Sequence, residues 1–293
     1  MSSTKIGYFA GIGYIVTTLF SMFYVETVIS HLQNKFVALF IACVISAIFF
    51  TIINIRKMDK VFLSVVNSWR LYLLLSLLIG ANWLCSIFGV INGNAFLYAL
   101  GYFLFSASLA HFNSFISTKN KQSYYLCIAS WVVIAIAFAI NEKFYFGLLI
   151  ALLGGATGYC YRRITFSFSS KENLSPGQII SVRFYPLIIL LPSKFTFLDF
   201  SKIMQHHLLL ILIFAVVSFI IPNYLNQVAI IKIGANKSTI LAALLFPASW
   251  FIEEIMHHTV MINANFILAA CAMLIILTPF LMKKISRAPI YAN

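Results

Sequence analysis

Ten apolar stretches, each close to 20 residues long, occupy most of this 293-residue chain. A helix needs about 20 apolar residues to cross the hydrocarbon core of a bilayer, and it satisfies its own backbone hydrogen bonds there. Stretches of this length and number therefore predict an all-α polytopic membrane protein. The expected spans cover about 6–26, 36–55, 69–91, 93–116, 123–140, 144–164, 177–192, 206–230, 237–258 and 264–282.

The composition excludes the other broad classes of protein. Only 9% of the residues are charged and 62% are apolar, whereas a soluble domain carries about a quarter charged residues. So few charged side chains cannot cover a water-soluble surface, which rules out a soluble enzyme, a disordered chain and a nucleic-acid-binding protein. We expect no enzymatic activity, no metal and no cofactor, because the five cysteines lack metal-type spacing and no phosphate-binding loop is present.

The basic residues predict how the chain is oriented in the membrane. If the N-terminus is inside, fifteen of the 20 Lys and Arg residues fall in inner segments and four in outer ones, with Arg183 inside the seventh span. Cytoplasmic segments of membrane proteins are enriched in Lys and Arg. Both termini are therefore expected in the cytoplasm, and the net charge of +13 is explained without a nucleic-acid partner.

Ten spans divide into two halves of five, residues 1–142 and 143–293, and an odd number of spans per half gives the halves opposite orientations. A Gly-x-x-x-Gly pattern opens each half, at 7–11 and at 154–158. The pattern has a second interpretation, because small residues also allow two helices to approach closely. Pro186 in the short seventh span fits the interrupted helices of transporters.

Three short motifs in the third and fourth spans carry a family resemblance: LIGANWL at 78–84, NGN at 92–94 and LGYF at 100–103. Together they resemble the RarD-type branch of the EamA family, in the drug/metabolite transporter (DMT) superfamily. The resemblance implies a secondary transporter of the bacterial inner membrane, with two inverted five-helix repeats around a central cavity lined by the fourth and ninth spans. It also makes Asn82, Trp83 and Tyr102 candidates for the cavity wall.

The chain departs from the family pattern at several positions. The family has a proline near the middle of each cavity-lining span; the ninth span here has Pro247, but the fourth has Ser106. Charged residues that the family carries elsewhere are replaced as well, so its substrate contacts cannot be transferred as a set. The replacing residues are Val25, Leu97, Lys119 and Val260.

Ionisable residues inside a span cost about 2.5–3.5 kcal/mol each at a helix centre and therefore indicate function. The ninth span holds Glu253 and Glu254, with His257 four residues after Glu253 on the same helical face. Glu254 shares a face with Pro247, and the match between the halves puts Asn113 at the equivalent position of the fourth span. Burial and a neighbouring carboxylate disfavour the charged form of Glu. We therefore expect Glu254, assisted by Glu253 and His257, to couple protons to substrate.

Other interpretations of this Glu-Glu-x-x-His-His sequence stay open. Carboxylates and imidazoles at positions i and i+4 could share a cation, which would make the protein a metal or organic-cation transporter. Alternatively, the end of the ninth span lies near water and its Glu and His residues are solvated. An intramembrane metalloprotease fits less well, because one such family uses EExxxR and position 257 is His.

Other polar residues within the spans have two interpretations each. His111 in the fourth span is either part of the transport site or hydrogen-bonded to a neighbouring helix. Arg183 is expected to snorkel to the inner surface, with a role as counter-ion for an anionic substrate as the second interpretation. Asn226, together with Asn223 and Gln227, forms a polar face of the eighth span that contacts either substrate or another helix.

These observations predict an inner-membrane permease that exports a small metabolite or drug by alternating access, driven by proton exchange or by the substrate gradient. On this hypothesis Glu254, Asn113 and Asn82 face one shared cavity. The expected partners are a small-molecule substrate, membrane lipid and protons, and a homodimer is compatible with the sequence. A non-transporting integral membrane protein with a decayed cavity is the alternative from another class, because several family residues are missing.

Overall fold

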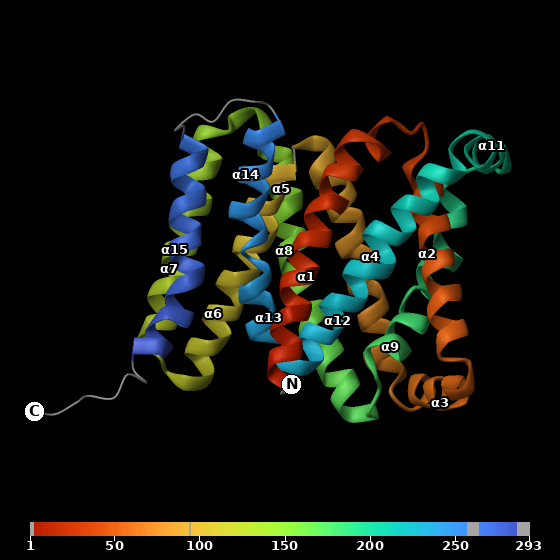
Figure 1. The fold of residues 1–293 in the computed structure, drawn as a ribbon. Coiled ribbons are helices and arrows are strands. Elements are labelled where there is room, and N and C mark those ends of the chain that lie inside the picture. The colour runs from red at the N-terminus through yellow and green to blue at the C-terminus, as the bar shows by residue number, and fades with distance from the viewer. Residues whose placement is uncertain (1–2, 94, 257–263, 286–293) are drawn as a thin grey trace, which may run out of the picture.

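The computed structural model describes residues 3–93, 95–256 and 264–285 (Figure 1). Nearly all of these residues are helical and no strand occurs among them, which confirms the prediction of an all-α protein. Seven helical segments in this part of the chain are long and apolar enough to cross a membrane. Large apolar side chains lie exposed on the outer faces of the helices, for example Phe9, Phe20, Ile52 and Leu153. The protein is a multi-pass membrane protein.

The first half of the chain crosses the bundle repeatedly with short connections. Its helices are α1 (Ser3–Thr27), α2 (Lys35–Ile53), α3 (Met58–Asn67), α4 (Trp69–Asn92), α5 (Ala95–Ala99), α6 (Phe105–Thr118) and α7 (Lys121–Ile140). A π-helical turn, η3 (Leu100–Leu104), joins α5 directly to α6. Such turns inside longer helices often mark functional sites.

The second half is built from helices of very different lengths, from 6 to 28 residues. Its helices are α8 (Tyr145–Glu172), α9 (Pro176–Arg183), α10 (Tyr185–Leu190), α11 (Phe197–Phe214), α12 (Ile221–Ile233), α13 (Ala235–Ala242), α14 (Leu245–Met256) and α15 (Ala264–Ile285). A second π-helical turn, η6 (Ala215–Ile220), joins α11 to α12.

Local capping residues set where several helices begin. The Asn34 side chain accepts a backbone N–H at the start of α2. Ser175 and Gln178 form a reciprocal capping box at the start of α9, and Thr196 and Asp199 form another at the start of α11. These side chains satisfy backbone donors that a helix leaves unpaired at its first turn.

The seventh expected span is interrupted at Phe184, between α9 and α10. Pro186 has no N–H to donate to the carbonyl of Val182, four residues earlier. The Tyr72 hydroxyl of α4 donates to that carbonyl instead, at 3.1 Å. The interruption comes one residue after Arg183 and ties the broken helix to α4.

Two helix pairs form the most extensive contacts of the described residues: α4 packs along α8, and α1 packs along α12. A Cβ atom at Gly154 would lie 3.1 Å from the Cβ of Cys85 on α4, and one at Gly7 would lie 2.8 Å from the Cβ of Lys232 on α12. Both glycine patterns therefore allow close helix approach, which confirms the second interpretation of the Gly-x-x-x-Gly sequences.

The residues of the two contacts are related by one constant shift in sequence position. Position 154 lies 147 residues after position 7, and position 232 lies 147 residues after position 85. The same shift relates the next contact along each pair, because Gly11 faces Ala229 and Gly158 faces Asn82. The α1–α12 and α4–α8 pairs thus repeat one packing arrangement, each with one helix from the first half and one from the second.

The two ends of the described chain lie at one edge of the bundle. Figure 1 shows that α1 begins and α15 ends at the lower edge, with α3 lying across it. The α2–α4 and α6–α7 connections also lie at this edge, and they carry the basic residues Arg56, Lys57, Lys119 and Lys121.

Candidate functional site

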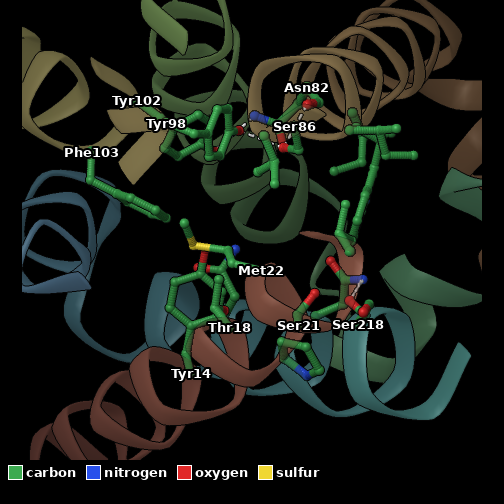
Figure 2. Close-up of a pocket in the computed structure, with 18 of the residues that line it drawn as sticks. Tyr14, Thr18, Ser21, Met22, Asn82, Ser86, Tyr98, Tyr102, Phe103 and Ser218 are labelled. Carbon is green, nitrogen blue, oxygen red and sulfur yellow. Dashed lines mark hydrogen bonds between the residues drawn. The ribbon is translucent and has the colours of Figure 1, made fainter. Parts of the chain in front are cut away.

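An internal cavity of about 70 Å³ lies where α1, α4, α8 and α12 meet, and both π-helical turns contribute to its wall (Figure 2). A water molecule needs roughly 10–15 Å³ of such space, so the cavity in this conformation has room for several waters or for a small chemical group. Its described wall consists of aromatic rings, hydroxyl groups, amides and aliphatic side chains, without an acidic or basic residue. Such a wall suits an amphipathic ligand.

One side of the cavity is a hydrogen-bonded network on α4, α5 and η3 (Figure 2). Asn82 donates from its amide to the Tyr102 hydroxyl at 2.8 Å and to the carbonyl of Gly154 at 3.2 Å. The hydroxyls of Ser86 and Tyr98 lie 2.5 Å apart. Because these buried groups satisfy one another, the two tyrosine rings are held in fixed positions.

On the side of the cavity formed by η6 and α12, fewer of the buried polar groups have hydrogen-bond partners. Trp83 of α4 stacks on Phe219 of η6, with 3.9 Å between ring centroids and an interplanar angle of 15°. Asn223 donates to the Phe219 carbonyl at 2.7 Å. In contrast, Ser218 Oγ and Asn226 Oδ1 are buried without a hydrogen-bond partner. A buried polar atom left unpaired costs about 1–3 kcal/mol, so these two atoms are available to a ligand.

Five polar or aromatic residues singled out from the sequence lie on this wall: Asn82, Trp83, Tyr102, Asn223 and Asn226. The fourth span contributes through α5 and η3, but α13 and α14 of the ninth span contribute no described residue. The expectation that the ninth span lines the cavity is therefore wrong for the described residues. The reason is packing, because α14 lies against α15, α5 and α1.

The carboxylates of the ninth span form a separate group. Glu253 and Glu254 lie in α14, away from the cavity wall. The Glu253 carboxyl is close enough to those of Glu26, on α1, and Glu254 for their charges to repel. His257 lies outside the described residues. The carboxylates therefore gather at the contact between α14 and α1.

Asn113 and His111 of α6 also lie away from the cavity wall. Asn113 accepts from Arg163 Nη1 at 3.0 Å on an exposed surface. His111 is buried, and its Nε2 has no hydrogen-bond partner. The expectation that Glu254, Asn113 and Asn82 share one cavity is therefore wrong, since only Asn82 lines it. α6 packs against α7, α8 and α13 rather than around the cavity.

Besides Tyr98, two further tyrosines that were not among the predicted site residues line the cavity, Tyr14 from α1 and Tyr161 from α8. Each follows the second glycine of its Gly-x-x-x-Gly pattern by three positions. Position 161 lies 147 residues after position 14, the shift that also relates the helix contacts. The repeated sequence Gly-x-x-x-Gly-x-x-Tyr is the signal that identifies both.

Arg162 is bonded to the first of these tyrosines. Arg162 lies within α8, which continues to Glu172, and its side chain is only 2% exposed. Its Nη1 donates to the Ser238 carbonyl at 2.9 Å, and its Nη2 donates to the Tyr14 hydroxyl at 3.4 Å. None of its nitrogens is both buried and without a partner. Arg162 is thus a satisfied cation that joins α8 to α13 and α1.

Arg183 is bonded to the second tyrosine. The expectation that it snorkels to the inner surface is wrong, because its side chain is 0% exposed. Its Nη1 donates to the Tyr161 hydroxyl and to Gln227 Oε1, the latter at 3.5 Å, and its guanidinium carbon lies 4.7 Å from the centre of the Phe184 ring. α9 packs between α2 and α12, and this directs Arg183 into the bundle.

Metal binding finds no support in the described residues, among which no group of three or more His, Cys, Asp or Glu side chains could hold a metal ion. The two histidines of the Glu-Glu-x-x-His-His sequence lie outside those residues. No protein-family model and no curated protein sequence matches the chain.

Proposed function

We propose that this protein is a secondary transporter, which moves a small metabolite or drug across a bacterial inner membrane by alternating access. The observation that carries the proposal is the internal cavity of mixed polar and apolar lining at the crossing of helices from both halves. Transporters commonly bind substrate between two repeats near the middle of the membrane. The motifs at 78–84, 92–94 and 100–103 support a place in the RarD-type branch of the EamA family.

The ten expected spans form two inverted five-helix repeats, residues 1–142 and 143–293, on this proposal. Support comes from the constant shift of 147 positions that relates the α1–α12 contact to the α4–α8 contact. Two pairs of cavity-lining residues obey the same shift, Tyr14 with Tyr161 and Ile79 with Asn226. A cavity lined by equivalent positions of both halves lies on their approximate symmetry axis.

Alternating access then consists of movement of the α1–α12 pair against the α4–α8 pair. The glycine contacts within each pair bring the helices close together, which makes each pair a rigid unit. Contacts between the pairs, of α1 with α4 and of α8 with α12, are less extensive. The cavity lies between the two units, so that their relative rotation opens it to one side of the membrane or the other.

Proton coupling belongs, on this proposal, to the carboxylate group at the contact of α14 and α1. Glu253 is close to Glu254 and to Glu26 of α1, the helix that also contributes Val25 to the cavity wall. Protonation of these carboxylates removes their mutual repulsion and changes how α14 packs on α1. The basic edge of the bundle faces the cytoplasm, as the distribution of Lys and Arg favours.

The proposal is tested by flux into proteoliposomes with a panel of small amphipathic solutes at two pH values. Ser218→Phe places a large ring at the cavity wall, and Val216→Phe, on the exposed face of the same turn, is the matched control. We expect a solute whose flux falls at least tenfold in Ser218→Phe and persists in Val216→Phe. Flux of no solute, or flux only of divalent cations, would contradict the proposal in favour of a non-transporting protein or a metal transporter.

A further inference from the structure

Three buried nitrogen atoms next to the cavity have hydrogens to donate and no acceptor. They are Nε and Nη2 of Arg183 and Nε2 of Gln227. The two side chains are in contact, because Arg183 Nη1 donates to Gln227 Oε1. The Tyr161 hydroxyl bonds to both, donating to Gln227 Oε1 at 3.1 Å. The cluster therefore has an excess of donors, which is the arrangement that an anion satisfies.

The charge of the cluster also favours an anionic ligand. A guanidinium stays protonated in proteins, so Arg183 brings a full positive charge to a position with 0% exposure. Its ionisable neighbours are Tyr161 and Cys43, and in the described part of the chain it forms no ion pair with Asp or Glu. An isolated buried charge costs several kcal/mol in real proteins. A negative charge supplied by a ligand would remove this cost.

The cluster is joined to the cavity through Tyr161. Tyr161 lies on the cavity wall and also accepts the hydrogen bond from Arg183. Asn226, next to Gln227 in the chain, lies on the same wall, with its Oδ1 buried and without a partner. Tyr161 therefore connects the Arg183 guanidinium to the cavity wall, and a cavity ligand reaches the Arg183 donors only if the Tyr161 side chain moves.

We propose that Arg183, Gln227 and Tyr161 form a subsite for a carboxylate group of the transported solute; this inference rests on the proposed transport function. Nε and Nη2 lie on one edge of the guanidinium, and their parallel N–H bonds match the two oxygens of a carboxylate. One arginine balances one negative charge, whereas a phosphate group carries about −1.5 to −2. The solute class is therefore a monocarboxylate with an amphipathic body, which the tyrosine and tryptophan rings of the cavity contact.

The test uses four monocarboxylates, acetate, lactate, benzoate and phenylacetate, each beside its neutral amide. Binding is measured by thermal stabilisation of the detergent-solubilised full-length protein, and transport by uptake into proteoliposomes. The variants are Arg183→Gln, Arg183→Lys and the control Arg163→Gln, which removes an equal charge from the exposed surface contact with Asn113. Elution as a single species in size-exclusion chromatography checks that each variant is folded.

We expect at least one carboxylate to bind and to be taken up, and its amide to do so at least tenfold less well. Arg183→Gln removes this preference and Arg163→Gln retains it. Arg183→Lys weakens carboxylate binding at least threefold, because an ammonium group cannot present two parallel N–H bonds. If Arg183→Gln does not fold, the weakening of carboxylate binding in Arg183→Lys decides the question, and unchanged binding there overturns the subsite.

The outcomes separate this inference from the proposed function. Uptake of amides without binding or uptake of carboxylates overturns the subsite and leaves transport intact. Carboxylate binding that depends on Arg183, without flux of any solute, supports the subsite and overturns transport. Stabilisation by chloride or inorganic phosphate alone overturns the carboxylate assignment, and a panel with neither binding nor flux overturns both proposals.

Discussion

The Tyr14–Arg162 and Tyr161–Arg183 pairs each join a buried arginine to a tyrosine of the cavity wall, and they differ in how far the arginine is satisfied. The tyrosines sit at equivalent positions after a Gly-x-x-x-Gly pattern, and both line the cavity. Arg162 donates to a backbone carbonyl and to Tyr14, whereas Arg183 keeps two buried nitrogens without an acceptor.

The difference teaches that a buried tyrosine–arginine contact can either stabilise the helix packing or provide a binding site. A satisfied buried cation contributes hydrogen bonds that hold helices together, as Arg162 does between α8 and α13. A buried cation without acceptors lowers stability, so we expect it to have a role other than helix packing. The repeat therefore supplies the two tyrosines, and the function we propose is carried by the Tyr161–Arg183 pair only. The following predictions are arranged from the largest expected effect to the smallest.

Replacing each arginine by glutamine gives the sharpest contrast. Arg162→Gln is expected to lower the free energy of unfolding by about 2–3 kcal/mol, because the Ser238 carbonyl and the Tyr14 hydroxyl lose a charged donor. Arg183→Gln leaves that free energy unchanged or raises it, because a buried charge without a counter-charge is removed. Denaturant titration in mixed micelles measures both. A greater loss of stability in Arg183→Gln would reverse the roles of the two residues.

A methyl group added to each second glycine tests whether the two helix pairs tolerate the same change. In Gly158→Ala the new Cβ meets the Tyr102 hydroxyl, which Asn82 holds in place, so we expect a loss of about 2 kcal/mol. In Gly11→Ala its close contact is with the flexible end of the Leu241 side chain, and the loss is expected to stay below about 1 kcal/mol. Denaturant titration measures both losses. Equal losses would mean that the hydrogen bond between Asn82 and Tyr102 adds no rigidity to the α4–α8 contact.

Removing each tyrosine hydroxyl compares the two pairs directly. The Tyr161 hydroxyl accepts from Arg183 and donates to Gln227, so Tyr161→Phe is expected to cost about 1–2 kcal/mol. The Tyr14 hydroxyl accepts one long hydrogen bond from Arg162, so Tyr14→Phe should cost less than about 0.5 kcal/mol. Unfolding midpoints of the two variants measure this difference, and a larger effect in Tyr14→Phe would refute the ranking.

Glu253 and Glu254 of α14 do not belong to either tyrosine–arginine pair. We expect them to affect the pH dependence of flux rather than stability. Glu254→Gln removes a charge that repels Glu253, so stability changes by less than about 0.5 kcal/mol while the response of flux to pH becomes flatter. Uptake measured across a pH series provides the test, with the exposed Glu142→Gln as control. Unchanged pH dependence in Glu254→Gln would remove these carboxylates from the coupling mechanism.

Sequence reasoning found part of the candidate site and missed the rest for an identifiable reason. Asn82, Trp83 and Tyr102 were found through short motifs, and Asn226 through its polar neighbours. Arg183 and the ninth span were misjudged because a helix that is apolar on nearly all sides carries no amphipathic pattern to indicate which face turns inward. Tyr14 and Tyr161 could have been found from the repeated Gly-x-x-x-Gly-x-x-Tyr sequence.

The sequence by itself determined that the chain is helical, multi-pass and rich in close helix contacts. Apolar length and glycine spacing are local properties, and a bilayer leaves a long apolar segment few other structures. The tertiary structure alone decided that Arg162 is satisfied and that Arg183 is not. Whether a buried cation finds an acceptor depends on which carbonyls and hydroxyls other helices bring beside it, and for Arg183 these are groups of α8 and α12, 22 and 44 residues away in the chain.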